Sequence, residues 1–404
     1  MRMPKSVLAV VAAATLALSA CAPTAESANE DPTATGSDSE SAAAPATPVK
    51  VGIIYSQTGP LAAYGEAFRT GFEAGLDYAT DGTNEVNGHA LEITYTDDAG
   101  NADKAVAAAK DAIGNGTKII AGTVVSGVAL AMAEQAEQNK VLYISGPAAT
   151  DAITGINDYT FRSGRQSVQD VMTAASFVES GQKVLVFAQN NAFGQGNVAA
   201  VKAVFGGVGA EVSELLVPED ATEFTPFARQ IVDAKPDMVF VAWAGATSGA
   251  MWQGLSQQGV LDATKVVTGL GDISTYGAYG EASDRINFLN HYFEGATDNE
   301  VNQAMIERVN EAGAEVDLFT PDGFVAAQMI VQAVAEGGDD VDAMIAALEG
   351  WEFDAPKGKQ TIRESDHAML QPMFQARLVD DGGTWKPELV EEVPADKTTP
   401  AEAQ

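Results

Sequence analysis

Short apolar runs alternate with segments whose apolar residues recur at helical spacing, from about residue 50 to about residue 390. The runs are rich in Val and Ile and are bounded by Gly, Asn and Asp, as expected of buried strands. In the first helical segment, Tyr64, Phe68, Phe72 and Leu76 fall on one i, i+4 row, which predicts a core-facing stripe. The predicted strands are 51–55, 91–96, 118–124, 141–145, 183–189, 211–217, 238–243, 265–269 and 286–293.

Strand–helix alternation of this kind is typical of parallel sheets with helices on both faces. Two similar halves meet at about residue 163, although no tight repeat relates them. We therefore predict an α/β fold of two lobes, each a doubly wound parallel sheet. After the first helical segment, the predicted helices are 102–113, 127–138, 166–179, 196–205, 223–234, 248–258, 299–312, 322–335 and 341–348.

Polar and aromatic residues gather where the predicted strands end. Ligands of doubly wound sheets bind at the carboxyl ends of the strands. The pattern therefore predicts a small-molecule site made of turns rich in Ser, Thr, Gly, Asn and aromatic residues. These turns are 56–60, 125–127, 146–150, 190–193, 243–247 and 269–276.

The N-terminus has the pattern of an export signal. Arg2 and Lys5 precede an apolar stretch over 7–17 that is too short to span a bilayer as a mature helix. The residues Leu-Ser-Ala-Cys follow at 18–21 and resemble the end of a bacterial lipoprotein signal. We predict a signal peptide over 1–20 and lipidation of Cys21, on the outer face of the cytoplasmic membrane. The alternative is an ordinary signal peptide with a fortuitous cysteine behind it.

Low-complexity segments flank the predicted body. Residues 21–48 are nearly all Ala, Ser, Thr, Pro, Glu and Asp, and they carry too few large apolar residues to form a core. We interpret them as a disordered tether between the lipid and the folded body. We predict a similarly loose tail over residues 393–404. Cys21 is the only cysteine, so no internal disulfide can form.

Composition limits the possible partners. The 404 residues suffice for about two domains, and 46% of them are hydrophobic. Acidic residues number 56 against 23 basic ones, which gives a formal net charge of -33. This balance argues against nucleic acid, whose phosphates require Lys and Arg. We interpret the acidic excess as a soluble, self-repelling surface.

The sequence shows no clear carrier of enzymatic chemistry. The three histidines are far apart, and neither a G-x-S-x-G elbow nor an H-E-x-x-H motif occurs. A catalytic pair of carboxylates stays open among so many acids. The run 194–199 matches the dinucleotide pattern G-x-G-x-x-A, but it starts five residues beyond its strand, too far for a pyrophosphate to meet the helix. We predict a binding protein rather than an enzyme, with no cofactor and no metal.

Several stretches carry a family resemblance. The chain contains KVGIIYSQTGPLAAYGEAFRTGFEAGLDY, then GTVVSGVALAMAEQAEQNKVLYISGPAAT, FAQNNAFGQG, HYFEGATDNEVNQAMIE and DGFVAAQMIVQAV, in this order. Together they resemble the leucine/isoleucine/valine-binding protein family, the type I substrate-binding proteins of ABC importers. The resemblance covers roughly residues 49–392.

This resemblance implies two α/β lobes joined by three crossovers, a ligand held in the cleft between them, and docking of the closed form on a membrane permease. The first lobe would hold 49–163 and 292–352, and the second 164–291 and 353–392. A monomer is implied. A sensor lobe of the same fold and an enzyme are the rival classes.

The resemblance also assigns ligand contacts. Ser126, Ala148 and Thr150 match positions that hold the ligand carboxylate, although both hydroxyls could simply cap helices. Tyr64 matches a cleft tyrosine, and its alternative is the core-facing stripe. Arg165 could reach a carboxylate or serve only at the crossover.

Four positions depart from the family pattern or match it loosely. Phe193 and Phe324 stand where tyrosines are usual, and Trp243 ends a strand at the cleft. Asp272 is the acid that could hold a ligand ammonium. The resemblance implies a small apolar amino acid of the branched-chain type. The alternative is an aromatic or other apolar carboxylic acid without an amine. Two reasons favour it: Phe and Trp replace the residues usual in the family, and Asp272 is shifted along the sequence from the family's ammonium-binding acid.

Overall fold

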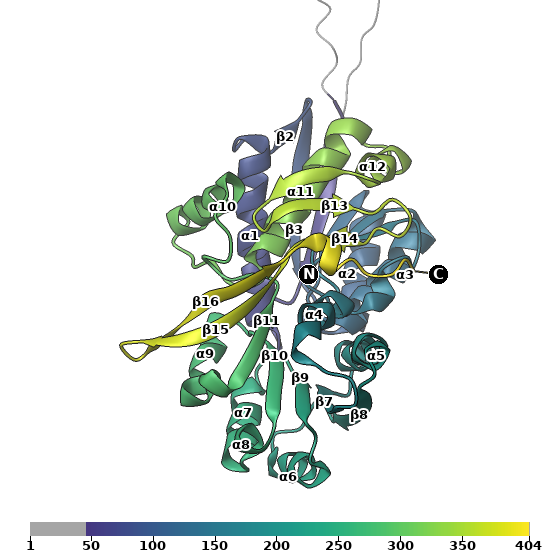
Figure 1. Cartoon of the computed structure of the whole chain (residues 1–404). Helices are drawn as coiled ribbons and strands as arrows, with labels where there is room; N and C mark the ends of the chain where they lie inside the picture. The colour runs from purple at the N-terminus through teal and green to yellow at the C-terminus, as the bar shows by residue number, and fades with distance from the viewer. Residues whose placement is uncertain (1–45, 404) are drawn as a thin grey trace, which may run out of the picture. The chain divides into compact units, whose positions relative to one another are not determined.

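The computed structural model describes residues 46–403. The predicted signal peptide, the predicted lipidation site Cys21 and most of the predicted tether lie outside these described residues. The described chain forms two large sheets and one small sheet with helices around them, as Figure 1 shows. Over the same 46–403, no helix combines the length and the apolarity needed to cross a bilayer.

The first sheet has the strand order β2-β3-β1-β4-β5-β6. Its neighbours are parallel except β2 and β3, which pair antiparallel. Crossover helices between parallel strands place the strand ends along one edge, as the alternation predicts. The strands are β1 (Val49–Tyr55), β2 (Glu85–Val86), β3 (His89–Asp97), β4 (Ile119–Gly122), β5 (Leu142–Ser145) and β6 (Thr160–Arg162).

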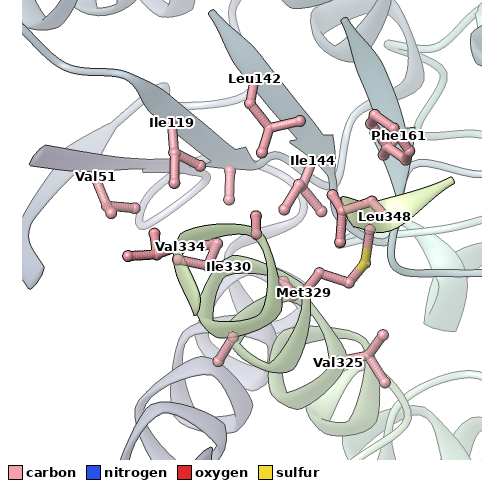
Figure 2. Packing of buried hydrophobic residues seen from close by; sticks show 14 of the residues in the cluster. Val51, Ile119, Leu142, Ile144, Phe161, Val325, Met329, Ile330, Val334 and Leu348 are labelled. Carbon is pink, nitrogen blue, oxygen red and sulfur yellow. The ribbon is translucent and has the colours of Figure 1, made fainter. Parts of the chain in front are cut away.

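Helices cover both faces of this sheet. On one face, Val51, Ile119 and Leu142 pack on Ile330 and Val334 of α11, and Figure 2 shows these side chains meeting. The other face packs on α2 and α3. The helices of this half are α1 (Ala62–Thr80), α2 (Ala102–Gly114), α3 (Ser126–Asn139), α10 (Glu300–Glu311), α11 (Thr320–Gly337) and α12 (Val341–Leu348).

The second sheet has the order β16-β15-β11-β10-β9-β7-β8. Five of its strands run parallel, and the hairpin of β15 and β16 adds two antiparallel strands. This hairpin is the long yellow pair in Figure 1. The strands are β7 (Lys183–Gln189), β8 (Glu211–Val217), β9 (Met238–Ala242), β10 (Lys265–Gly269), β11 (Ile286–Asn290), β15 (Met373–Asp381) and β16 (Thr384–Val393).

The helices of the second sheet bury two apolar clusters against its faces. The glycines of the dinucleotide-like run lie inside α5. A Cβ at Gly194 would lie 1.8 Å from the Gln189 carbonyl oxygen, so this glycine lets the helix start close to the strand end. The helices are α4 (Ser167–Thr173), α5 (Ala192–Gly207), α6 (Thr225–Ala234), α7 (Ser248–Gln257), α8 (Val260–Ala263) and α9 (Ile273–Tyr279).

A small third sheet alters the expected assignment of the last 40 residues of the body. It consists of β12 (Glu352–Ala355), β13 (Gly358–Ile362) and β14 (Met369–Leu370). Phe353 and Ile362 join the apolar core of the first sheet, whereas β15 and β16 pair in the second. The predicted segment 353–392 is therefore divided, because its first part buries its apolar residues on the other half.

The C-terminal residues differ from the predicted loose tail. Val393 ends β16, and a short turn of 3-10 helix follows over Ala395–Lys397. Arg363 then donates to the carbonyl oxygens of Pro400 and Ala401 at 2.7 and 3.3 Å. Backbone carbonyl groups that accept from a guanidinium hold the segment in place although its composition is polar.

Candidate ligand-binding site

A cavity of about 770 Å³ opens where strands of both large sheets end. The turns after β1, β4 and β5 line one side, and the turns after β7, β9 and β10 line the other. This volume lies within the range of small-molecule pockets. The cavity therefore lies at the strand ends at which the sequence predicts a ligand.

Ser126 begins α3 and lines this cavity. Its hydroxyl oxygen accepts from the Thr150 backbone N–H at 3.3 Å, which leaves the hydroxyl proton of Ser126 free to be donated. The first N–H groups of an α-helix have no partner within the helix, so Ser126 and Gly127 add backbone donors. We call this part of the lining, formed by Ser126 and Gly127, the anion corner, because its donors suit an anion.

Arg165 adds a buried positive charge to the lining. Its Nε lies 3.1 Å from Asp170 Oδ2, and its Nη1 donates to the Pro147 carbonyl oxygen at 2.9 Å. Its guanidinium carbon lies 5.4 Å from the centre of the Phe319 ring. Burial raises the pKa of Asp170, and Arg165 opposes that shift. The pair fixes the guanidinium at the wall of the cavity.

Aromatic side chains form much of the remaining wall. Trp243 stacks on Phe187 with ring centres 5.5 Å apart, and its indole N–H donates to Thr247 Oγ1 at 3.0 Å. Tyr64 meets Phe319 edge to face at 4.8 Å. Because the only polar atom of Trp243 is already bonded, the indole offers a ligand apolar contact.

Four predicted site residues line the cavity together: Tyr64, Ser126, Phe193 and Trp243. Arg165 lines it as well. Ala148, Thr150, Asp272 and Phe324 are absent from the lining.

Two predicted residues that do not line the cavity, Ala148 and Thr150, lie directly behind the anion corner. Ala148 is fully buried against Ala129 and Ile153. The Thr150 hydroxyl accepts from the Ala152 backbone N–H at 3.4 Å, as a cap, while its own N–H donates to Ser126. The Thr150 hydroxyl thus caps the short helix that follows and does not line the cavity, and its backbone N–H supports the serine.

Phe324 lies away from the cavity, which corrects its expected place at the cleft. It is fully buried with Tyr292 and Met305, and its ring centre lies 5.1 Å from that of Tyr78. Phe319, which the sequence analysis missed, is the aromatic residue that this segment presents to the cavity. Five residues along a helix turn a side chain by about 140°, so the two rings cannot share a face.

Asp272 is engaged next to the cavity instead of lining it. Its Oδ1 accepts from the Ser274 hydroxyl. Asp317 lies nearby and accepts from the Ile273 and Leu318 backbone N–H groups at 3.3 and 2.7 Å. Burial raises the pKa of Asp317 to about 7, hydrogen bonds from Leu318 and Ile273 oppose that shift, and the charge of Asp272 adds to it. The expected ammonium acid therefore has a partner of its own.

His291 is another lining residue that the sequence did not single out. It stacks on Phe319 with ring centres 4.8 Å apart. Burial lowers the pKa of His291 well below its ordinary value, and the charges of Arg165 and Lys357 act in the same direction. The imidazole is therefore neutral. The sequence around His291 contains no metal-binding motif, so nothing in it indicates that this histidine lines a cavity.

Comparison with known proteins identifies the family. The profile described as periplasmic binding protein matches residues 48–384. The Leu/Ile/Val-binding protein homolog 3 of Brucella melitensis is 25% identical over 343 residues, which are 83% of this chain and 92% of the relative.

Two solved structures support the same conclusion. An ABC-type branched-chain amino acid transporter protein from Rhodopseudomonas palustris CGA009 is 34% identical, with a TM-score of 0.73 over 86% of this chain and 97% of that one. A solute-binding protein from Rhodopseudomonas palustris BisB5, solved with 3,4-dihydroxybenzoic acid, is 25% identical, with a TM-score of 0.76 over 86% and 98%. The resemblance and the α/β fold predicted from the sequence are confirmed: the chain belongs to the periplasmic binding protein family, the solute-binding proteins of ABC transporters.

Proposed function

We propose that the protein captures a small apolar carboxylic acid in this cavity and delivers it, chemically unchanged, to an ABC permease. The observation that supports this most is the pairing of an anion corner with aromatic walls in one cavity. Ser126 offers a free hydroxyl proton at the start of α3, and the guanidinium of Arg165, which Asp170 holds through Nε, lies in the same lining. A carboxylate taken out of water needs such charge-assisted hydrogen bonds.

Within this class, the geometry favours an acid without an amine. A buried ammonium needs a carboxylate or several carbonyl groups. Asp272 does not line the cavity, and the buried lining acid Asp170 is paired with Arg165. The BisB5 protein solved with 3,4-dihydroxybenzoic acid supports this choice.

A branched-chain amino acid is the second candidate. The names of the Brucella relative and of the CGA009 protein support it. Glu219 and Asp220 line the cavity from the exposed turn after β8, so an ammonium could face them. The anion corner, the aromatic wall and the volume of the proposed site suit either ligand.

Calorimetric titration with matched ligand pairs tests the proposal. Leucine and 4-methylpentanoate differ only in the amine, as do phenylalanine and 3-phenylpropionate. We expect the amine-free member of at least one pair to bind more tightly, and Ser126→Ala to weaken it. Tighter binding of both amino acids would move the assignment to the second candidate. Absence of binding by all four acids, and by benzoate and 3,4-dihydroxybenzoate, would contradict capture of an apolar carboxylate.

The remaining features of the proposal concern the protein's setting. We propose a monomer, anchored through a lipid on Cys21 and acting without a cofactor. The cavity holds its ligand by hydrogen bonds and apolar contact, and the proposed role requires no bond of the ligand to break.

A further inference from the structure

Two turns meet across the rim of the cavity. One follows β1 of the first sheet and contains Pro60 and Leu61; the other follows β9 of the second sheet and contains Gly245 and Ala246. The Ala246 backbone N–H donates to the Pro60 carbonyl oxygen at 3.1 Å. Pro60, Leu61 and Ala246 all line the cavity, so this bond joins the two halves at the border of the cavity.

Gly245 lies at the point of closest approach. A Cβ there would lie 2.8 Å from the Pro60 carbonyl oxygen and 2.8 Å from Leu61 Cδ2, closer than real Cβ atoms come. The first of these neighbours is a backbone atom, which cannot turn away as a side chain can. The two turns can therefore meet in this way only when residue 245 has no side chain.

Tyr64 lies near the same turn, because the Gly245 backbone is among the groups that shift its pKa. Burial raises the pKa of Tyr64, the charge of Asp272 adds to that shift, and a hydrogen bond from the Gly245 backbone opposes it. Tyr64 belongs to α1 of the first half and lines the cavity together with Pro60 and Ala246.

We propose that Gly245 is a positioning residue for ligand retention: its bare backbone allows the two turns to close over the cavity. This inference rests on the proposed function, because it gives that site its closing contact. A side chain at 245 holds the turns apart, and the ligand then leaves faster. Entry is affected less, because an open rim does not hinder it.

Gly245→Ala tests the inference, with Gly295→Ala as the matched control. Both glycines have φ of +88°, so alanine meets the same backbone strain at each. No atom lies within 4 Å of a Cβ at Gly295. Gly295→Ala should lose the thermal stability that backbone strain alone costs, and Gly245→Ala should lose at least as much. Only Gly245→Ala should raise the ligand dissociation rate in stopped-flow measurements, by roughly tenfold, with a smaller change in association.

A ligand-independent measurement separates this inference from the proposed function. In a Cys21→Ser background, K110C on α2 and D233C on α6 place dyes on exposed positions of the two halves. Single-molecule energy transfer should show a larger separation in Gly245→Ala than in the wild type, without any ligand, and no shift in Gly295→Ala. Equal separations in all three proteins would overturn the inference, whichever acids bind. Should Gly245→Ala fail to fold, Leu61→Trp crowds the same contact from the other side and should give the same shift.

Discussion

Ser126 and Thr150 carry similar hydroxyls but have different surroundings. Each hydroxyl oxygen accepts from a backbone N–H, that of Thr150 for Ser126 and that of Ala152 for Thr150, but only Ser126 lines the cavity and can donate its proton there. Ser126→Ala should therefore weaken binding of a carboxylate by about 1.5–3 kcal/mol, the worth of a hydrogen bond to a charged group. Thr150→Val keeps the backbone donor and should change affinity little. Titration calorimetry of both variants measures the contrast, and equal effects would contradict it.

Asp317 should make stability depend on pH. Its folded pKa of about 7 exceeds the value near 3.9 of an unfolded aspartate. The folded state therefore holds this proton between about pH 4 and pH 7 while the unfolded state has lost it, so stability falls as pH rises through that window. Asp317→Asn removes this contribution.

The expected result is that the melting temperature of Asp317→Asn, relative to that of the wild type, rises from pH 4.5 to pH 7.5 and then stays level. Thermal unfolding at four pH values measures it. A difference that does not vary with pH would show that Asp317 does not titrate in this range.

Single residues also show which parts of the site the sequence could predict. Ser126, Phe193 and Trp243 reach the cavity because each lies within a short turn of a strand end, which the apolar runs mark, whereas Tyr64 reaches it from the first turn of α1. The choice between Phe319 and Phe324 depends on the rotation of α11 about its axis. That rotation is set by packing on α1, which no local pattern reports.

At the scale of elements, a buried ion pair joins the third sheet to α11. Lys357 Nζ lies 3.2 Å from Asp322 Oδ1, and both side chains are fully buried. Removing one partner of such a pair leaves the other charge without compensation. Asp322→Asn and Lys357→Met should each lower the free energy of unfolding by about 3–5 kcal/mol.

The double variant Lys357→Met/Asp322→Leu provides the control, because it removes both charges. It should recover most of the loss of either single variant in urea unfolding. Two single variants of nearly wild-type stability would show that the pair contributes little to holding the hairpin of β12 and β13.

Elements differ in how well the sequence predicts them. β7, β8 and β10 have the predicted bounds: β7 and β10 are mostly apolar, and β8 ends in the apolar residues Leu215–Val217 before a polar turn. The strands from β12 onward were not predicted. β13 and β16 are largely polar and have no continuous apolar run, so their strand conformation depends on pairing with a neighbour.

For the whole molecule, family membership places the protein outside the cytoplasm, and the lipid anchor stays a prediction. Cys21→Ser should release the protein from the membrane fraction without lowering its melting temperature, because the residue precedes the described body. Fractionation followed by immunoblotting measures the release. Continued sedimentation of the variant with membranes would contradict lipidation at this cysteine.

The position of Trp243 should make the intrinsic fluorescence of the protein sensitive to ligand binding. Trp243 lines the cavity, whereas Trp252 and Trp351 pack on Tyr279 and Phe353. A ligand that displaces water from the indole face changes the polarity around this fluorophore, so binding should shift the emission of the unlabelled protein. Trp243→Phe should abolish the shift while retaining an apolar wall. The chain thus contains its own optical reporter, and titrations of the native protein need no dye.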